Sequence, residues 1–377
     1  MDICKLGDIA KFATGKLNSN AAQDNGKYPF FTCAPEALMI DDYSFDTEAI
    51  ILAGNNAEGN FHIQYFKGKF NAYQRTYVIE SLNENKVDTK YLYYALKTCL
   101  LHFNQISQGS ATKFLTAKIL NSFELPIPEI EIQKKIARTL GNIDNKIKTN
   151  KAINENLEQQ AQAIFKSWFV DFEPFNGEMP HDWIVSRLGD IASIKTNSFS
   201  PVKNPDAQLE HYSIPAYDEQ KYPVFESAAG VKSNKYILSK NSVMISKLNP
   251  DTKRVWRPMC LSELAVSSTE FIIFEAFNPA YRDFVFSIID SAAFSDWMCA
   301  HTTGSTNSRQ RTTPSATLEF QVAFPDEKTI TDFCAIVTQM YDTIALNICE
   351  NQMLAQLRDS ILPKLMSGEL DVSNLNL

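Results

Sequence analysis

The side chains best suited to a specific binding role are polar and basic residues in a few short segments of each half of the chain. In the first half these candidates are Asn55, Asn56, Gln74, Arg75, Ser110, Thr112 and Lys113. In the second half they are Lys247, Asn249, Lys253, Arg254, Arg257, Ser305, Thr306, Asn307, Arg309 and Arg311. Asn and Gln can bind adenine in a bidentate manner, Arg and Lys can bind guanine, and Ser and Thr hydroxyls suit phosphate. The residue types therefore indicate contact with DNA, although any one of them alone could be an ordinary turn or surface residue.

Sequence motifs that would carry catalysis or hold a cofactor are absent. The chain has no Gly-x-Gly element, no P-loop and no Gly-x-Ser-x-Gly motif. The segment Asn278-Pro279-Ala280-Tyr281 approaches the catalytic tetrad of an adenine methyltransferase but lacks its second proline. Cys299 and His301 lie close enough in sequence to suggest a metal, yet no second ligand pair accompanies them. We therefore expect a protein that is not an enzyme and that holds neither metal nor cofactor.

Composition places the chain among folded proteins of more than one domain. Its 377 residues are 44% hydrophobic and 11% aromatic, which is enough for two cores. Its seven cysteines form no Cys-x-x-Cys pair, and no apolar run approaches the roughly 20 residues of a membrane helix. These features predict a cytoplasmic protein without a membrane partner. The net charge of −8 is unusual for a DNA-binding protein, but residues 228–262 carry seven Lys and Arg against one acid. Either DNA contact or a solvated loop would explain that local excess.

The chain contains an internal duplication. The segment Leu6-Gly7-Asp8-Ile9-Ala10 recurs 182 positions later as residues 188–192, and the pair Gly109-Ser110 recurs at 304–305. A strand-like segment that ends in proline then follows in each copy, at residues 123–128 and 320–325. Short apolar runs between turn signals predict strands in both halves, with a helical stretch in each. The sequence thus predicts an α+β fold with two similar lobes related by a pseudo-two-fold axis.

After its proline, each copy continues as a heptad pattern, which predicts two long helices. The first seam comprises Ile136, Leu140, Ile143, Ile147, Asn150, Asn154, Leu157, Ala161, Ile164 and Trp168. The second, 197 positions later, comprises Phe333, Val337, Met340, Ile344, Asn347, Asn351, Leu354, Arg358, Ile361 and Leu365. The average step of 3.5 is that of coiled-coil a and d positions. Only Arg358 breaks the correspondence, and both seams place asparagine at the same two positions.

A long helix with one apolar stripe needs a partner in water, so we expect the two helices to pack on each other in antiparallel orientation. With full overlap, the numbers of facing residues should sum to about 501 (Ile136 with Leu365, for example). Asn150 then faces Asn351, and Asn154 faces Asn347, so these asparagines would fix the helix register. In the alternative arrangement, each stripe packs on its own lobe. Pro363 should end or kink the second helix near residue 362.

In this order and repetition, these segments resemble the specificity subunits of type I restriction–modification systems, over essentially the whole chain. The resemblance rests on the duplicated opening, the Gly-Ser loops, the helix start at residues 128–136 and the ending at 357–368. The second helix opening, at 325–330, lacks the usual Glu-Gln pattern. The implied domains are a target-recognition domain at 1–128, a helix and linker at 129–173, a second target-recognition domain at 174–325, a second helix at 326–366 and a tail at 367–377.

The resemblance implies that each target-recognition domain reads one half of a split site in double-stranded DNA and that the helices set the gap. Two modification subunits, which carry S-adenosylmethionine and methylate adenine, would dock on the helices, and an ATP-dependent restriction subunit is a further possible partner. Candidate docking residues are Lys134, Lys135, Gln159 and Gln162, although solvation explains them equally well. The alternatives are a coiled-coil scaffold that does not bind DNA, and a nuclease or methylase of unrecognised type.

Overall fold

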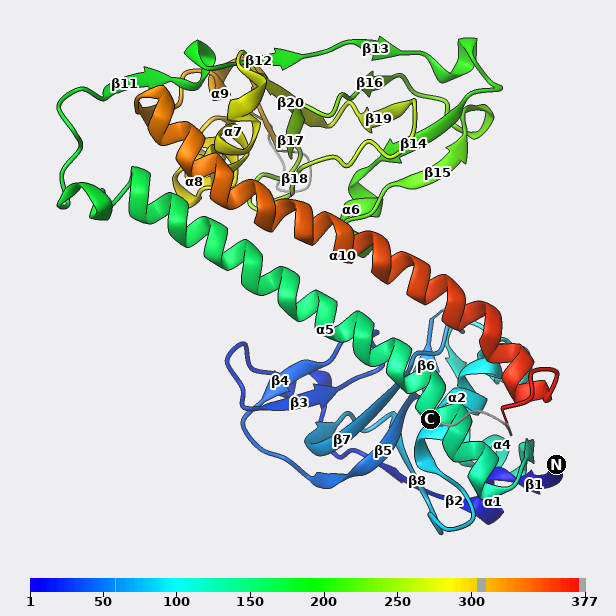
Figure 1. The fold of residues 1–377 in the computed structure, drawn as a ribbon. Helices are drawn as coiled ribbons and strands as arrows, with labels where there is room; N and C mark the ends of the chain where they lie inside the picture. The colour runs from blue at the N-terminus through cyan, green and yellow to red at the C-terminus, as the bar shows by residue number, and fades with distance from the viewer. Residues whose placement is uncertain (58, 304–309, 373–377) are drawn as a thin grey trace. The chain divides into compact units, whose positions relative to one another are not determined.

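The computed structural model describes residues 1–57, 59–303 and 310–372. The chain divides into two compact units: unit 1 comprises residues 1–146 and 353–377, and unit 2 comprises 147–352. Each unit contains one end of both long helices, α5 (Ile130–Phe169) and α10 (Glu327–Ser367), as Figure 1 shows. Each also has its own hydrophobic core. No helix in these described ranges is long and apolar enough to cross a bilayer.

The lobe of unit 1 is built on a six-stranded sheet with the strand order β2-β8-β5-β7-β3-β4. Strand β5 lies between β8 and β7 inside the sheet, and its last five residues, Ala49–Ala53, are all buried. Helix α2 packs on this sheet, and the side chain of Asp88 caps it by accepting a hydrogen bond from the Tyr91 amide at 2.7 Å. The elements are β1 (Asp2–Lys5), α1 (Leu6–Ile9), β2 (Ala10–Thr14), β3 (Tyr28–Phe31), β4 (Leu38–Ile40), β5 (Phe45–Ala53), β6 (Asn55–Asn56), β7 (Ile63–Ala72), β8 (Thr76–Ser81), α2 (Thr89–Thr98), α3 (Leu100–Ile106), β9 (Lys113–Phe114), α4 (Ala117–Ser122) and β10 (Glu124–Ile127).

The lobe of unit 2 has two sheets, of strand order β12-β20-β17-β18 and β13-β16-β19-β14-β15. Helix α7 packs on β17 and β20. The elements are β11 (Ile184–Arg187), β12 (Ala192–Lys195), β13 (Ser198–Phe199), β14 (Gln208–Tyr212), α6 (Ile214–Gln220), β15 (Val224–Ser227), β16 (Lys235–Ile237), β17 (Ser242–Ser246), β18 (Val255–Trp256), β19 (Ala265–Ser268), β20 (Phe271–Ala276), α7 (Arg282–Ile289), α8 (Ala292–Ala300), β21 (Thr302–Thr303), β22 (Arg311–Thr312), α9 (Pro314–Thr317) and β23 (Gln321–Phe324).

The predicted duplication is confirmed by the strand pairing within each unit. The order β2-β8-β5 in unit 1 has its counterpart in β12-β20-β17 in unit 2, and the ribbon β1-β10 has its counterpart in β11-β23. The repeated Leu-Gly opening has the same role twice: the Leu6 amide donates to the Phe123 carbonyl at 2.7 Å, and the Leu188 amide to the Phe320 carbonyl at 2.8 Å. A Cβ on Gly7 would lie 3.0 Å from the Asn121 carbonyl oxygen, so this close approach favours glycine.

The predicted antiparallel register of the two helices is confirmed in both units. In unit 2, Asn150 Nδ2 donates to Asn351 Oδ1 at 2.9 Å, and Asn347 Nδ2 donates to Asn154 Oδ1 at 2.8 Å. Trp168 and Phe333 lie in the same core with ring centroids 6.0 Å apart. In unit 1, Ile136 and Leu365 are buried in one core cluster. The helices also pack on the lobes, because both core clusters combine seam residues with lobe residues.

Arg358, the exception in the seam, has a specific partner in unit 1. Its Nη1 donates to Asp144 Oδ1 on α5 at 2.8 Å, and the Tyr94 hydroxyl on α2 donates to the same carboxylate at 2.5 Å. Burial and the hydrogen bond to Asp144 raise the pKa of Tyr94, so this hydroxyl remains a donor. In unit 2, the position 197 residues after Asp144 is Tyr341, whose hydroxyl lies 3.1 Å from Ser287 Oγ on α7. Each repeat thus joins its lobe helix to a long helix by a hydrogen bond at the same place.

Of the two outcomes expected at Pro363, an end of the helix is wrong, because α10 continues to Ser367. Proline costs one backbone hydrogen bond, but the last turn is held by Leu362, Leu365 and Met366, which are buried in the core of unit 1. The helix ends instead at Ser367 and is followed by Gly368, which has a φ of +78° and is the residue type favoured after a helix C-terminus.

Candidate nucleic-acid interface

Several of the predicted contact residues of unit 1 converge because three segments of the lobe are hydrogen-bonded to one another. The amide of Gly54, which follows β5, donates to the Arg75 carbonyl at 2.8 Å, and the Leu115 amide donates to the Gly54 carbonyl at 2.9 Å. In the ladder between β6 and β9, Asn55 pairs with Phe114 and Asn56 with Lys113. We call this arrangement of residues 54–56, 74–75 and 113–115 the three-segment frame of unit 1.

A cleft of about 570 Å³ opens beside this frame. Gln74 and Arg75 are both exposed at its edge, and Gln74 Nε2 donates to Asn18 Oδ1 at 2.6 Å. The guanidinium carbon of Arg75 lies 5.7 Å from the centroid of the Phe114 ring, a cation–π arrangement. The residues that line the cleft are Thr14, Gly54, Gln74, Arg75, Tyr77, Gln108, Gly109, Phe114, Leu115, Thr116 and Ala117.

The Gly-Ser loop of unit 1 borders the same cleft and depends on its glycine. Gly109 has a φ of +103°, and a Cβ there would lie 2.0 Å from the Thr112 carbonyl oxygen. Ser110 follows it as an exposed residue. The corresponding candidates of unit 2 (Ser305, Thr306, Asn307 and Arg309) lie outside the residues that the structure describes.

Unit 2 contains the same frame, built with the same backbone hydrogen bonds. The Lys247 amide donates to the Glu270 carbonyl at 2.9 Å, and the Thr312 amide donates to the Lys247 carbonyl at 3.0 Å. An isolated β-bridge between Leu248 and Arg311 corresponds to the pairing of Asn55 with Phe114 in unit 1. The Asn249 amide donates to the Gln310 carbonyl at 2.9 Å. Residues 247–249, 269–270 and 310–312 form the three-segment frame of unit 2. Three of the predicted contact residues, Lys247, Asn249 and Arg311, belong to it.

The other three described candidates of unit 2 are engaged in ion pairs. Lys253 Nζ lies 2.6 Å from Asp290 Oδ1, and the Arg254 guanidinium contacts Asp218 at 2.6 and 2.9 Å. The Arg257 side chain is 11% exposed. These pairs leave the three side chains little freedom to reach phosphate. Three of the seven basic residues between 228 and 262 are thus compensated by acids that lie elsewhere in the sequence.

Arg257 joins the lobe of unit 2 to α10 through a buried charge cluster. It donates to Asp283 on α7 at 2.7 Å and to Asp342 on α10 at 2.8 Å, and Thr338 on α10 donates to Asp283 at 2.6 Å. Burial raises the pKa of Asp283, but the hydrogen bonds from Arg282 and Arg257 outweigh this and keep it below its ordinary value. A structural role therefore accounts for Arg257.

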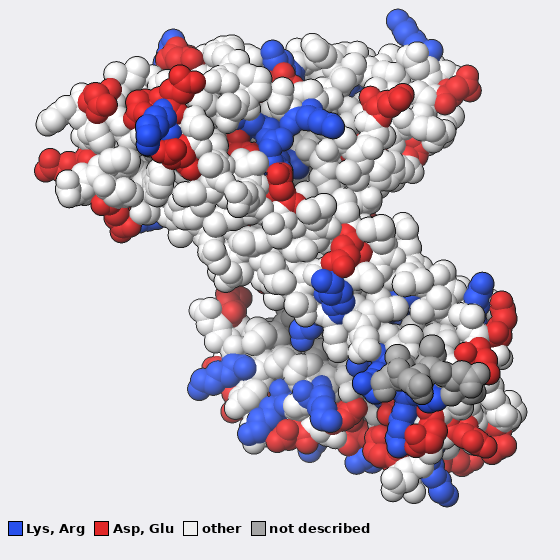
Figure 2. Space-filling view, viewed as in Figure 1, with Lys and Arg blue, Asp and Glu red and all other residues white. Residues whose placement is uncertain are grey.

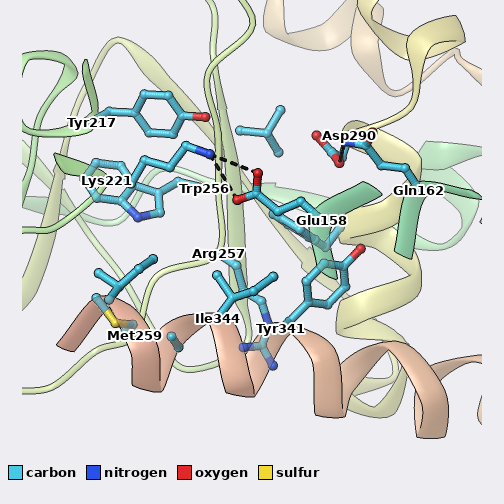
Figure 3. Close-up of a pocket in the computed structure, with 14 residues that line it drawn as sticks. Glu158, Gln162, Tyr217, Lys221, Trp256, Arg257, Met259, Asp290, Tyr341 and Ile344 are labelled. Atoms are coloured by element: carbon cyan, nitrogen blue, oxygen red, sulfur yellow. Dashed lines mark hydrogen bonds and ion pairs between the residues drawn. The ribbon is translucent and has the colours of Figure 1, made fainter. Parts of the chain in front are cut away.

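The cavity beside this cluster, about 90 Å³ in volume, is shown in Figure 3. Tyr217, Trp256 and Tyr341 contribute to its wall, and Lys221 Nζ lies 3.0 Å from Glu158 Oε1 on α5. Each of the four charged residues that line it, Glu158, Lys221, Arg257 and Asp290, has an ion-pair partner. The cavity thus marks where the lobe of unit 2 packs on the helices, and its lining offers no uncompensated charge to a substrate.

Among the described residues, no group of three or more His, Cys, Asp or Glu side chains could hold a metal ion. Acidic and basic side chains are intermixed on the visible face of each unit (Figure 2). Of the candidate docking residues, Lys134 pairs with Glu131 at 3.2 Å and Gln162 Nε2 donates to Asp290 at 2.7 Å, whereas Gln159 is exposed.

Two frame residues whose side chains bear on recognition, Phe114 and Glu270, were not predicted from the sequence. Glu270 stands 195 positions after Arg75, the same separation as between the repeated Gly-Ser pairs, so alignment of the repeats would have found it. Phe114 was missed because a single aromatic residue after a loop gives no periodic signal. Its place beside Arg75 depends on strand pairing.

Each of the two lobes contains both helices and strands, has the same frame and packs on the paired long helices. The fold is therefore a duplicated one, in which the long helices link the lobes. Comparisons with known proteins show which proteins this chain resembles. Residues 1–159 match the family "Type I restriction modification DNA specificity domain". The chain is 36% identical over 181 residues to the EcoDI specificity subunit of Escherichia coli, an alignment that covers 48% of this chain and 38% of that protein.

A second relative, the MjaIX specificity subunit of Methanocaldococcus jannaschii, is 27% identical over 328 residues, which cover 77% of this chain and 71% of the relative. The fold matches the crystal structure of a type I restriction–modification S subunit from M. genitalium with a TM-score of 0.66 at 16% identity, over 97% of this chain and 95% of the other. The resemblance inferred from the sequence is thus confirmed by relatives that are type I specificity subunits, and the structural match shows that the chain shares the fold of an S subunit.

Proposed function

We propose that this chain is the DNA sequence-recognition subunit of a cytoplasmic type I restriction–modification complex. In this proposal, each lobe binds one half of a split site in double-stranded DNA through its three-segment frame, and α5 and α10 set the gap between the halves. Two modification subunits, which carry S-adenosylmethionine and methylate adenine, dock on the helices. A restriction subunit that uses ATP would be a further partner. The chain itself supplies no catalytic group and no cofactor.

One observation carries the proposal: the frame occurs twice with the same backbone hydrogen bonds but with different side chains. Gly54, Asn55 and Arg75 of unit 1 correspond to Lys247, Leu248 and Glu270 of unit 2. Backbone and phosphate contacts position a protein on DNA, whereas side chains at base edges specify the sequence. A repeated backbone with divergent side chains is therefore the arrangement expected of two readers that bind different half-sites.

The test is to express the chain with the modification subunits of its host and to map methylated adenines on genomic DNA. We expect methylation confined to a split sequence with two unlike halves. Methylation without sequence preference would contradict the proposal. The purified chain alone should transfer no labelled methyl group from S-adenosylmethionine to DNA. Transfer by the chain alone would favour the methylase alternative.

The scaffold alternative is supported by the net charge of −8 and by the acids that pair with Lys253, Arg254 and Arg257. Gel-shift titration of a random duplex, with and without modification subunits, separates the two functions. A recognition subunit should shift the duplex at least within the complex. The absence of a shift in both cases would favour a scaffold.

A further inference from the structure

The two frames differ in chemistry at two equivalent positions, which are occupied by residues 75 and 114 in unit 1 and by residues 270 and 311 in unit 2. The carbonyl of Arg75 accepts from Gly54, and that of Glu270 accepts from Lys247, so residues 75 and 270 are equivalent. The strand pairings of Asn55 with Phe114 and of Leu248 with Arg311 make residues 114 and 311 equivalent. Unit 1 therefore has arginine and phenylalanine where unit 2 has glutamate and arginine.

In unit 1 this pair presents an uncompensated guanidinium. Arg75 is exposed at the edge of the cleft, and it has no carboxylate partner among the residues that the structure describes. The Phe114 ring, with its centroid 5.7 Å away, supports the guanidinium by a cation–π contact, which does not use its N–H donors. A planar guanidinium with free donors matches O6 and N7 of guanine in the major groove.

In unit 2 the residues at the equivalent positions, Glu270 and Arg311, form an ion pair with each other. Arg311 Nε and Nη2 donate to the two carboxylate oxygens of Glu270 at 2.9 and 3.0 Å. These hydrogen bonds occupy the Nε–Nη2 edge of the guanidinium, one of the two edges that can make a bidentate contact, and they raise the pKa of Arg311. The Arg311 side chain is 42% exposed, so the pair is still accessible. Its chemistry differs from that of Arg75 because its charge is compensated.

We propose that residues 75 and 270 determine specificity at one equivalent base pair in each half-site. Arg75 binds a guanine in the half-site of the first lobe. The ion pair with Glu270 keeps Arg311 from making the corresponding contact, so the second lobe does not select guanine there. This inference rests on the proposed function, since it assumes that both lobes bind DNA.

The experiment uses the complex with modification subunits and duplexes that contain the mapped split site. In the first half-site, each guanine is replaced in turn by 7-deazaguanine, which lacks the N7 acceptor. One such replacement should weaken binding of the unaltered complex about 10- to 150-fold, the range expected for the loss of one hydrogen bond to a charged donor. The variant Arg75→Gln should be insensitive to that same replacement and should leave the second half-site unchanged. Arg187→Gln, an exposed arginine outside both frames, is the control and should keep the full sensitivity.

A second variant tests unit 2 independently and leaves Arg75 intact. Glu270→Gln should free Arg311 and create a preference for guanine at one position of the second half-site, read from the map of methylated adenines. The inference is overturned if Arg75→Gln keeps the wild-type sensitivity, if it alters the second half-site, or if Glu270→Gln leaves both halves unchanged. If the unaltered complex shows no split site at all, the proposed function itself fails, which is a distinguishable result.

Discussion

Replacement of Asn154, which is buried, and of Asn347, which is half-buried, by leucine tests how the helices keep their register. Asn154 is 8% exposed and accepts a hydrogen bond from Asn347 Nδ2 at 2.8 Å. The single variant Asn154→Leu leaves this donor without its acceptor inside the seam. An unsatisfied polar group costs about 1–3 kcal/mol when it is buried, and Asn347 is half-buried, so we expect the free energy of unfolding to fall by about 1 kcal/mol.

The double variant Asn154→Leu/Asn347→Leu removes both polar groups and leaves an apolar seam. Replacement of both partners of a buried polar pair is often neutral or stabilising, so we expect stability within about 1 kcal/mol of the wild-type chain, or above it. The two changes should therefore be strongly non-additive, with a coupling energy of at least about 1 kcal/mol.

Urea denaturation followed by circular dichroism, on the wild-type chain, both single variants and the double variant, measures this coupling. Asn156→Leu is the matched control, since Asn156 is an exposed asparagine on the same helix and its replacement should change stability by less than about 0.5 kcal/mol. Additive destabilisation in the double variant would refute the assignment of a paired role to these asparagines.

Three further predictions concern the charge cluster, the frame and the helices. The pKa of Asp283 is depressed in the folded chain, so its contribution to stability is present at neutral pH and is lost as the pH falls below about 4. The difference in stability between the wild-type chain and Asp283→Asn should therefore be largest near pH 7 and should shrink in acid. A constant difference in urea titrations from pH 7 to 3 would contradict this. Gly54→Ala would place a Cβ 2.4 Å from the Arg75 carbonyl oxygen, so it should destabilise the chain by about 1–3 kcal/mol and weaken DNA binding in gel shifts, whereas Gly230→Ala, with open space around its Cβ, should do neither. Insertion of one heptad in both α5 and α10 adds about 10.5 Å of helix, so the gap in the methylated site should widen by roughly three base pairs, and an unchanged gap would exclude a spacing role for the helices.

The features that could be predicted from sequence are those set by periodic or repeated patterns. The heptad seams gave the register of the helices, because apolar spacing and matched asparagines depend only on local order and on one partner. The duplicated opening and the Gly-Ser pairs gave two similar lobes. Arg358, the one irregular seam position, could not be explained in advance, because its partner Asp144 is not a seam residue.

The pairing of charges could not be predicted, because it depends on residues brought together by the tertiary fold. Arg257 and Asp283 are 26 positions apart, and Arg257 and Asp342 are 85 apart. The local excess of basic residues therefore suggested DNA contact at positions that the fold places in ion pairs. Three candidates within the frame of unit 1, Asn55, Asn56 and Lys113, are instead held together by strand pairing. Their contact with DNA stays a prediction.

The most direct test of the account is an exchange of the second lobe. Residues 178–325 would be replaced by the corresponding lobe of a related specificity subunit with a known site, and methylated adenines would be mapped in cells that express the chimaera with the modification subunits. The account predicts that one half of the split site changes to that of the donor, while the other half is unchanged. A change in both halves, or in neither, would contradict the claim that each lobe reads its own half.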